Sequence, residues 1–150
     1  MTDYALIIQQ IEALTEISQD PIALMANAAA LLYHSMDRIN WAGFYLVKDG
    51  ALLLGPFQGK VACVRIEKGR GVCGTAWAQD RVQVVDDVHA FPGHIACDSA
   101  SNSEIVVPLH CNGEVIAVLD IDSPIPARFS KADAAGLTAL AQRISLLADF

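Results

Sequence analysis

Apolar residues near the N-terminus recur at intervals of three and four positions, the spacing of a helix with one buried face. They are Ile7, Ile8, Ile11, Leu14 and Ile17. This spacing predicts a helix over about residues 3–18. A second helix is expected over about residues 20–36, because Asp20 can cap its first turn and Pro21 is tolerated at the first helical position.

From Asn40 onward the pattern changes to β-branched and aromatic residues interrupted by turn residues, which predicts strands. The predicted strands are Trp41–Val47, Ala51–Phe57, Val61–Ile66, Arg81–Val85, Glu104–His110 and Glu114–Asp122. Asp49-Gly50 and Asn112-Gly113 are hairpin turn signals. A short helix is expected within 74–80. Ser130 with Asp133 resembles a capping box that opens a last helix over about 130–148.

This order of elements predicts an α+β fold with a six-stranded, mostly antiparallel sheet and helices packed on one face. A polar stretch over residues 86–103 has neither helical nor strand periodicity, and such long connections inside compact domains are usually functional. We expect this loop to cover the other face of the sheet. With 150 residues, the chain is predicted to form one domain over 1–150.

The acidic composition and the lack of long apolar runs limit the kinds of molecule that the protein is expected to bind. The net charge of -7 repels phosphate backbones and anionic lipid, and we expect no local cluster of Lys or Arg to offset it. No apolar run approaches the ~20 residues of a membrane span. Nucleic acid and membrane are therefore not expected as partners. The N-terminus has no secretory pattern, since Asp3 stands where a basic region would begin, so a cytoplasmic protein is expected.

Four cysteines in a reducing compartment are not expected to be structural disulfides. Cys63, Cys73, Cys97 and Cys111 lack the close spacing of a structural zinc site, and no metal is expected. Cys97 lies among polar loop residues, which suits a reactive thiolate. If its loop folds back on the sheet, Cys63 or Cys73 comes within disulfide reach. Cys111, beside the hairpin turn, is interpreted as a small buried apolar residue.

Three carboxylates form the second candidate group. Asp120 and Asp122 are two positions apart on a predicted strand and hence share a face. Neighbouring carboxylates disfavour joint ionisation, so one can remain protonated and donate a proton. Asp122 could equally serve only to end the strand. Glu104 joins the group only if the hairpin has a three-residue loop, which sets it opposite Asp120, or a bulge near Pro108, because a plain two-residue turn sets it opposite Ile121.

Two further features complete the candidates. Trp41 and Tyr45 share strand parity and could line a small apolar pocket. The glycine-rich segment 69–74 matches neither the Walker nor the dinucleotide spacing, so a turn and packing role is expected and no cofactor is implied.

Three segments together resemble one family, the free methionine-(R)-sulfoxide reductases, which are stand-alone enzymes with a GAF fold. The segments are FQGKVACVRIEKGRGVCGTAW (57–77), HIACDSASNSEIVVP (94–108) and GEVIAVLDIDS (113–123). NWAGFYLV (40–47) also matches. The resemblance covers nearly the whole chain, and the spacing of three cysteines with the HIAC segment distinguishes the reductases from other GAF domains.

The resemblance implies that Cys97 is the catalytic cysteine, Cys63 the usual resolving cysteine and Cys73 a third family cysteine of less certain role. Substrate binding is implied for Glu104, Asp120, Asp122, Trp41 and Tyr45, and for backbone amides of the loop at Ile95, Ala96 and Cys97. The implied substrate is free methionine (R)-sulfoxide and the implied reductant is thioredoxin or a similar dithiol. A homodimer is left open.

The mechanism expected from this resemblance starts with attack of Cys97 on the sulfoxide sulfur, while Glu104 or Asp122 protonates the leaving oxygen. Cys97 becomes a sulfenic acid, which Cys63 converts to a disulfide. Asp120 with a neighbouring carboxylate binds the α-ammonium group. Two alternatives remain, a ligand-sensing GAF module without turnover and a thiol-based redox sensor.

Overall fold

The computed structural model describes residues 1–94 and 100–150. Its helices are α1 (Tyr4–Thr15), α2 (Pro21–Ser35), α3 (Gly71–Gln79) and α4 (Lys131–Leu147), with a 3-10 turn η1 at Val88–Ala90. Its strands are β1 (Trp41–Lys48), β2 (Ala51–Gly59), β3 (Arg65–Ile66), β4 (Gln83–Val85), β5 (Ser103–Cys111) and β6 (Glu114–Ser123). None of the described helices is long and apolar enough to cross a membrane.

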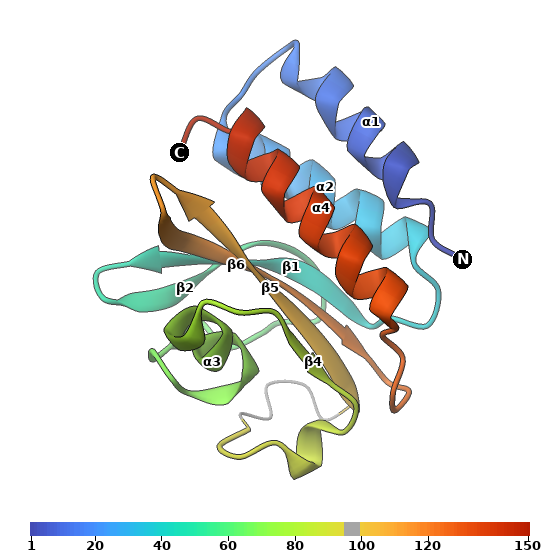
Figure 1. Cartoon of the computed structure of the whole chain (residues 1–150), viewed down its shortest axis with the longest axis vertical. Helices are drawn as coiled ribbons and strands as arrows, with labels where there is room; N and C mark the ends of the chain where they lie inside the picture. The colour runs from blue at the N-terminus through green and yellow to red at the C-terminus, as the bar shows by residue number, and fades with distance from the viewer. Residues whose placement is uncertain (95–99) are drawn as a thin grey trace.

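The strands form a six-stranded sheet in the order β3-β2-β1-β6-β5-β4, and neighbouring strands pair antiparallel. Helices α2 and α4 pack on one face, and α1 packs across those two helices, farthest from the sheet (Figure 1). This confirms the predicted α+β fold with a mostly antiparallel sheet. One detail differs, because α3 lies on the opposite face (Figure 1).

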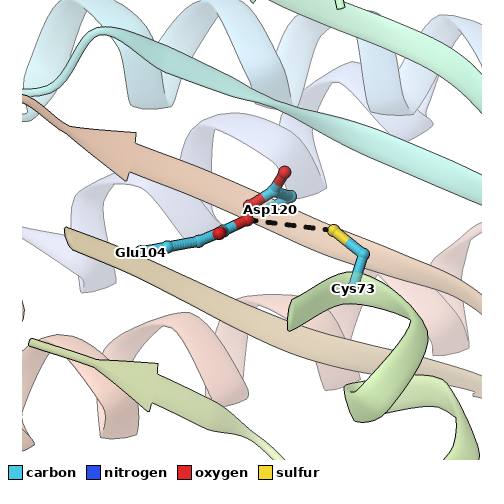
Figure 2. Close-up of side chains that lie close together, drawn as sticks. All are labelled: Cys73, Glu104 and Asp120. Carbon is cyan, nitrogen blue, oxygen red and sulfur yellow. Dashed lines mark hydrogen bonds between the residues drawn. The ribbon is translucent and has the colours of Figure 1, made fainter. Parts of the chain in front are cut away.

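The hairpin between β5 and β6 decides which carboxylates meet. Asn112 and Gly113 both have positive φ, as a two-residue turn requires, so the three-residue loop is wrong. A bulge between Leu109 and His110 then shifts the register, close to the predicted position near Pro108. Glu104 consequently pairs with Asp122 instead of Asp120 or Ile121. Figure 2 shows Glu104 and Asp120 extending toward each other from these neighbouring strands.

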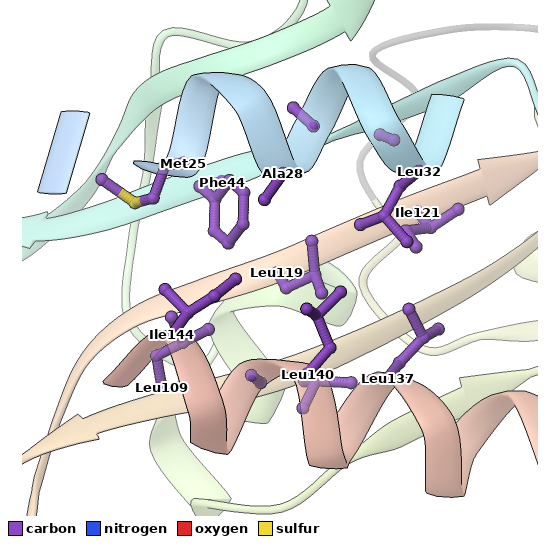
Figure 3. Close-up of a cluster of buried hydrophobic side chains, with 14 of the residues drawn as sticks. Met25, Ala28, Leu32, Phe44, Leu109, Leu119, Ile121, Leu137, Leu140 and Ile144 are labelled. Atoms are coloured by element: carbon purple, nitrogen blue, oxygen red, sulfur yellow. The ribbon is translucent and has the colours of Figure 1, made fainter. Parts of the chain in front are cut away.

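Two apolar clusters lie on the two faces of the sheet because side chains alternate along each strand. Phe44 of β1 points toward α2 and α4 and is fully buried in the larger cluster (Figure 3). Trp41 and Tyr45, on the other parity, belong to the smaller cluster under α3. The sheet face that carries the larger cluster is closed by helices, so a small molecule that contacts the sheet itself is expected on the α3 face.

Residues 61–66 were expected to be a full strand, but only Arg65–Ile66 pair with β2. Two backbone carbonyls just before this pair accept hydrogen bonds from side chains of β1. Trp41 Nε1 donates to the Lys60 carbonyl at 3.1 Å and Tyr45 Oη donates to the Cys63 carbonyl at 2.9 Å. Side chains therefore satisfy carbonyls that a longer ladder would have used, and the segment stays irregular.

The capping box at the start of α4 also ties this helix to α1. Asp133 accepts hydrogen bonds from Tyr4 Oη at 2.7 Å, from the Ser130 backbone N–H at 2.9 Å and from Arg128 at 3.1 Å. Burial alone would raise the pKa of Asp133, but these hydrogen bonds and the Arg128 charge outweigh it and hold the pKa below its usual value. The ionised form is therefore the one that the fold stabilises.

Replacing Asp133 by Asn is expected to lower the free energy of unfolding by about 2–3 kcal/mol at neutral pH, because several charge-assisted hydrogen bonds weaken together. The pKa of Asp133 is lowered in the folded state, so its contribution is present above the unfolded value of about 3.9 and is lost as pH falls through the folded pKa. Urea unfolding at pH 7 and pH 3 measures this.

A matched control for this comparison is Asp37→Asn, because Asp37 also contacts Arg128, at 3.0 Å, but its side chain is 74% exposed. Its replacement should cost less than about 1 kcal/mol. If the Asp133 and Asp37 variants were equally stable at neutral pH, the role given to Asp133 would be wrong.

Candidate active site

Three side chains from three elements meet on the α3 face of the sheet. Glu104 comes from β5, Asp120 from β6 and Cys73 from the first turn of α3 (Figure 2). Their sulfur and carboxylate oxygen atoms all lie within 4.8 Å of one another, and all three residues are buried. Cys73 Sγ donates a weak hydrogen bond to Glu104 Oε2 at 3.9 Å. We call this group the carboxylate cluster, with Asp122 as its fourth member.

Burial controls the protonation of this cluster. Burial raises the pKa of Glu104 well above its usual value, and the neighbouring charges of Asp120 and Asp122 raise it further. Burial also raises the pKa of Asp120, although hydrogen bonds with Glu104 and Cys73 oppose that shift. Glu104 is therefore the member most strongly held in the protonated form, which can donate a proton.

Cys73 is poorly suited to act as a thiolate. Burial raises the pKa of its thiol well above the usual value, and the nearby carboxylates Asp120 and Glu104 raise it further. At neutral pH the side chain is a neutral thiol that donates to Glu104.

An aromatic wall borders the carboxylate cluster. Trp41 stacks on Tyr45 with a centroid separation of 6.0 Å and on Phe57 at 5.2 Å. Trp41 also pairs with Asp122 across β1 and β6, which places the ring beside the carboxylates. Burial raises the pKa of Tyr45, so its hydroxyl stays neutral and donates to the Cys63 carbonyl. Phe57 was not among the predicted site residues, although its aromatic type and place in a predicted strand could have suggested it.

The wall and the cluster enclose a cavity of about 50 Å³. The predicted residues that line it are Trp41, Tyr45, Cys73, Glu104, Asp120 and Asp122. Asp120 is only 5% exposed, and its Oδ1 has no hydrogen-bond partner among the described residues. A buried carboxylate oxygen without a donor is costly, so this atom favours a ligand that brings a donor of its own.

Three further polar residues, Arg70, His94 and Ser101, border the cavity without having been predicted. Arg70 precedes α3, and the positive φ angles of Gly69 and Gly71 on either side of it confirm the expected turn role of segment 69–74. His94 also lines the cavity, and partial burial followed by the charge of His89 lowers its pKa, which favours the neutral ring. An arginine in a glycine-rich turn gives little sequence signal, since such residues are usually exposed.

The cysteines differ in state. Cys63 is disulfide-bonded, whereas Cys73 and Cys111 are free. Cys111 is half-buried at the end of β5, so its interpretation as a fully buried apolar residue is wrong. Of the remaining predicted residues, Ile95, Ala96 and Cys97 lie outside the described part of the chain.

A thiol with two carboxylates is also a ligand set that zinc accepts, so Cys73, Glu104 and Asp120 are the residues best placed to hold a metal ion within the described ranges. Burial raises the pKa of all three groups, which favours protons held among them when no ion is bound. Shared protons therefore account for their close approach.

Comparisons with known proteins agree with this fold. A family model described as the GAF domain matches residues 11–147. Free methionine-R-sulfoxide reductase of Escherichia coli is 58% identical over 123 residues, covering 82% of this chain and 74% of the relative. A solved structure of the reduced form of fRMsr of Staphylococcus aureus has a TM-score of 0.94 and 50% identity, covering 98% of this chain and 96% of that one.

A second solved structure was determined with a ligand in place. It is free methionine-R-sulfoxide reductase from Neisseria meningitidis in complex with its substrate, with a TM-score of 0.91 and 48% identity. The alignment covers 95% of this chain and 86% of that one.

Proposed function

The chain belongs to the GAF-domain family of free methionine-R-sulfoxide reductases, and from this membership we propose that it reduces free L-methionine (R)-S-oxide to L-methionine. One observation carries the proposal. A small cavity is lined by buried carboxylates, one of which has an unpartnered oxygen, and the disulfide-bonded Cys63 lies next to the cavity wall through its bond with Tyr45.

Substrate binding follows from the charges in the cavity. The unpartnered Asp120 Oδ1 accepts a hydrogen bond from the substrate α-ammonium, and the positive charge of that group offsets the buried carboxylates. The Trp41 ring supports the methyl and methylene groups. Backbone amides at Ile95 and Ala96 receive the α-carboxylate. A methionine sulfoxide within a peptide carries neither charge, which explains selectivity for the free amino acid.

The chemical step consumes two thiols. Cys97 thiolate attacks the sulfoxide sulfur while Glu104, with Asp122 beside it, protonates the sulfoxide oxygen, which is then transferred to sulfur of Cys97 as a sulfenic acid. Methionine leaves, reduced by two electrons. Cys63 thiol then attacks the sulfenic acid, forming the disulfide and releasing water. The disulfide-bonded state of Cys63 supports its assignment as the resolving cysteine.

Recycling requires an external dithiol that reduces this disulfide, and thioredoxin or a similar protein fits that chemistry. Such dithiols are kept reduced in the cytosol, which is the compartment that we propose for this protein.

Steady-state turnover tests the proposal. Protein with excess dithiothreitol is incubated separately with the R and S epimers of free methionine sulfoxide, and methionine is quantified. The R epimer is expected to be converted and the S epimer is not. Failure of the fully reduced protein to convert either epimer would overturn the proposal and favour a ligand-sensing module or a redox sensor.

Replacing Asp120 by Asn is expected to raise KM for free methionine (R)-sulfoxide by about 10- to 100-fold, because a charge-assisted hydrogen bond contributes about 1.5–3 kcal/mol. The effect on kcat should be smaller, since the α-ammonium is bound in both the ground state and the transition state. N-acetylated substrate, which has no ammonium group, serves as the control because wild-type protein and variant should then respond alike. A fall in kcat alone, with KM unchanged, would be contrary to this role.

A further inference from the structure

Two exposed apolar residues, Val61 and Val64, flank Cys63 in the sequence, and of the two only Val61 also borders the cavity. Val61 is 87% exposed and Val64 is 71% exposed, which is high for large apolar side chains. Single exposed apolar residues are common on soluble domains. Here the two flank, in the sequence, the cysteine whose disulfide must be reduced in every cycle, so their position has a use.

The backbone that carries this pair is fixed from the inside of the molecule. The Lys60 carbonyl accepts a bond from Trp41, the Cys63 carbonyl accepts one from Tyr45, and the Val64 carbonyl accepts one from Leu54 N–H at 2.9 Å. These hydrogen bonds restrain the backbone that carries the exposed side chains. Less conformational entropy is therefore lost when a partner binds.

The charge of this segment is opposite to that of the chain as a whole. Four of the ten basic residues fall within residues 60–70, and all four are exposed. They are Lys60, Arg65, Lys68 and Arg70. Glu67 is the acidic residue in this stretch, and it is already paired with Arg65 at 2.9 Å. The sequence-based expectation that no local basic cluster offsets the net charge of -7 is therefore wrong here.

We propose that a docking surface formed by Lys60, Val61, Val64, Arg65 and Lys68 binds an acidic dithiol reductase and presents Cys63 as the sulfur that it attacks. The inference rests on the proposed function and names the partner and the contact point for recycling. A small thiol such as dithiothreitol would gain little binding energy from the exposed valines or from the basic residues around them. An acidic protein with an apolar surface around its reactive cysteine would gain binding energy from contact with the valines and from attraction to the basic residues.

The redox step is an ordinary thiol–disulfide exchange. A thiolate of the reductase attacks Cys63 Sγ and forms a mixed disulfide, while the bond from Cys63 to its partner sulfur breaks and that sulfur leaves as a thiolate. The second thiol of the reductase then attacks the mixed disulfide and releases Cys63. Two electrons pass to the protein, the reductase becomes a disulfide, and its two protons reach the released thiolates.

Kinetics with two reductants test the docking surface. In Val64→Glu, and separately in Lys60→Glu with Arg65→Glu, kcat/KM for thioredoxin is expected to fall about tenfold, the effect of losing a central interface contact. The rate supported by dithiothreitol should stay at the wild-type value, which also verifies folding. Leu146→Glu, 76% exposed on α4 across the sheet, is the matched apolar control, and Lys131→Glu is the matched charge control.

Trapping locates the attacked sulfur without turnover. A thioredoxin variant whose second active-site cysteine is replaced by serine is mixed with the oxidised protein, and the adduct is mapped by peptide mass spectrometry. An adduct on Cys63 supports the proposal. An adduct on another cysteine, or unchanged thioredoxin kinetics in both docking-surface variants, would overturn it. Failure of the substrate reaction is seen separately, as a lack of methionine formation with dithiothreitol.

Discussion

Cys97→Ser is expected to lower dithiothreitol-supported methionine formation by roughly 10³-fold or more, the order of loss seen when an enzyme nucleophile is removed. A serine hydroxyl is a far weaker nucleophile toward sulfur, and it cannot be oxidised to a sulfenic acid. Steady-state assays with the free R epimer, together with circular dichroism of both proteins, measure the effect.

Cys111→Ser is the matched control for this substitution, because Cys111 is a free cysteine at the far end of β5 from Glu104. Its activity should equal that of the wild-type protein. A Cys97→Ser protein that kept most of the wild-type rate would show that the nucleophile has been misassigned.

Glu104→Gln is expected to lower kcat by about 10²- to 10⁴-fold, the usual contribution of a general acid. Burial, strengthened by the charges of Asp120 and Asp122, raises the pKa of Glu104, so its protonated form persists at neutral pH. Activity depends on this protonated form, and the wild-type rate should therefore fall as pH rises through the raised pKa. The Gln variant should lose that fall along with most of the rate.

Glu114→Gln is the control for this pH profile, since Glu114 is an exposed glutamate on β6 beside the hairpin turn. Its profile should match the wild-type profile. Should Glu104→Gln retain both the rate and the alkaline fall, the proton would have to come from another group, and Asp122 is the carboxylate paired with Glu104.

Hydrophobic periodicity, with the capping residues Asp20 and Ser130, was enough to predict most of the sheet and the three long helices, because each has one face that packs against an apolar cluster. Strand parity likewise placed Trp41 with Tyr45 on one face of their strand and Asp120 with Asp122 on one face of theirs, and the structure brings these four residues to one cavity. Alternation is a strictly local property, so it can be read without knowledge of the tertiary structure.

The register between β5 and β6 could not be predicted from local alternation. The Asn112-Gly113 signal correctly indicated a two-residue turn, but an extra residue on β6, Ile116, lies opposite the step from Leu109 to His110 and decides that Glu104 pairs with Asp122. A bulge leaves little trace in a run of apolar residues, because its effect depends on pairing with the neighbouring strand. The sequence therefore gave a choice of arrangements, and the structure selects among them.

The states of the cysteines also depended on tertiary contacts. Cys63 and Cys73 were equivalent resolving candidates by spacing, yet Cys73 lies buried beside Glu104 while Cys63 is disulfide-bonded. The irregular backbone that carries Cys63 exists because Tyr45 and Trp41 bond to carbonyls across the sheet. Such contacts join positions about 20 residues apart, and neither position alone indicates them.

The central claim is that this chain reduces free methionine (R)-sulfoxide with its own thiols, and an anaerobic single turnover tests it most directly. Protein is reduced, freed of reductant and mixed with the R epimer, and both methionine and remaining thiols are counted. The proposed function predicts that each methionine formed accompanies the loss of two thiols, with Cys63 found in the new disulfide. Bound substrate with no methionine and no loss of thiols would contradict the claim.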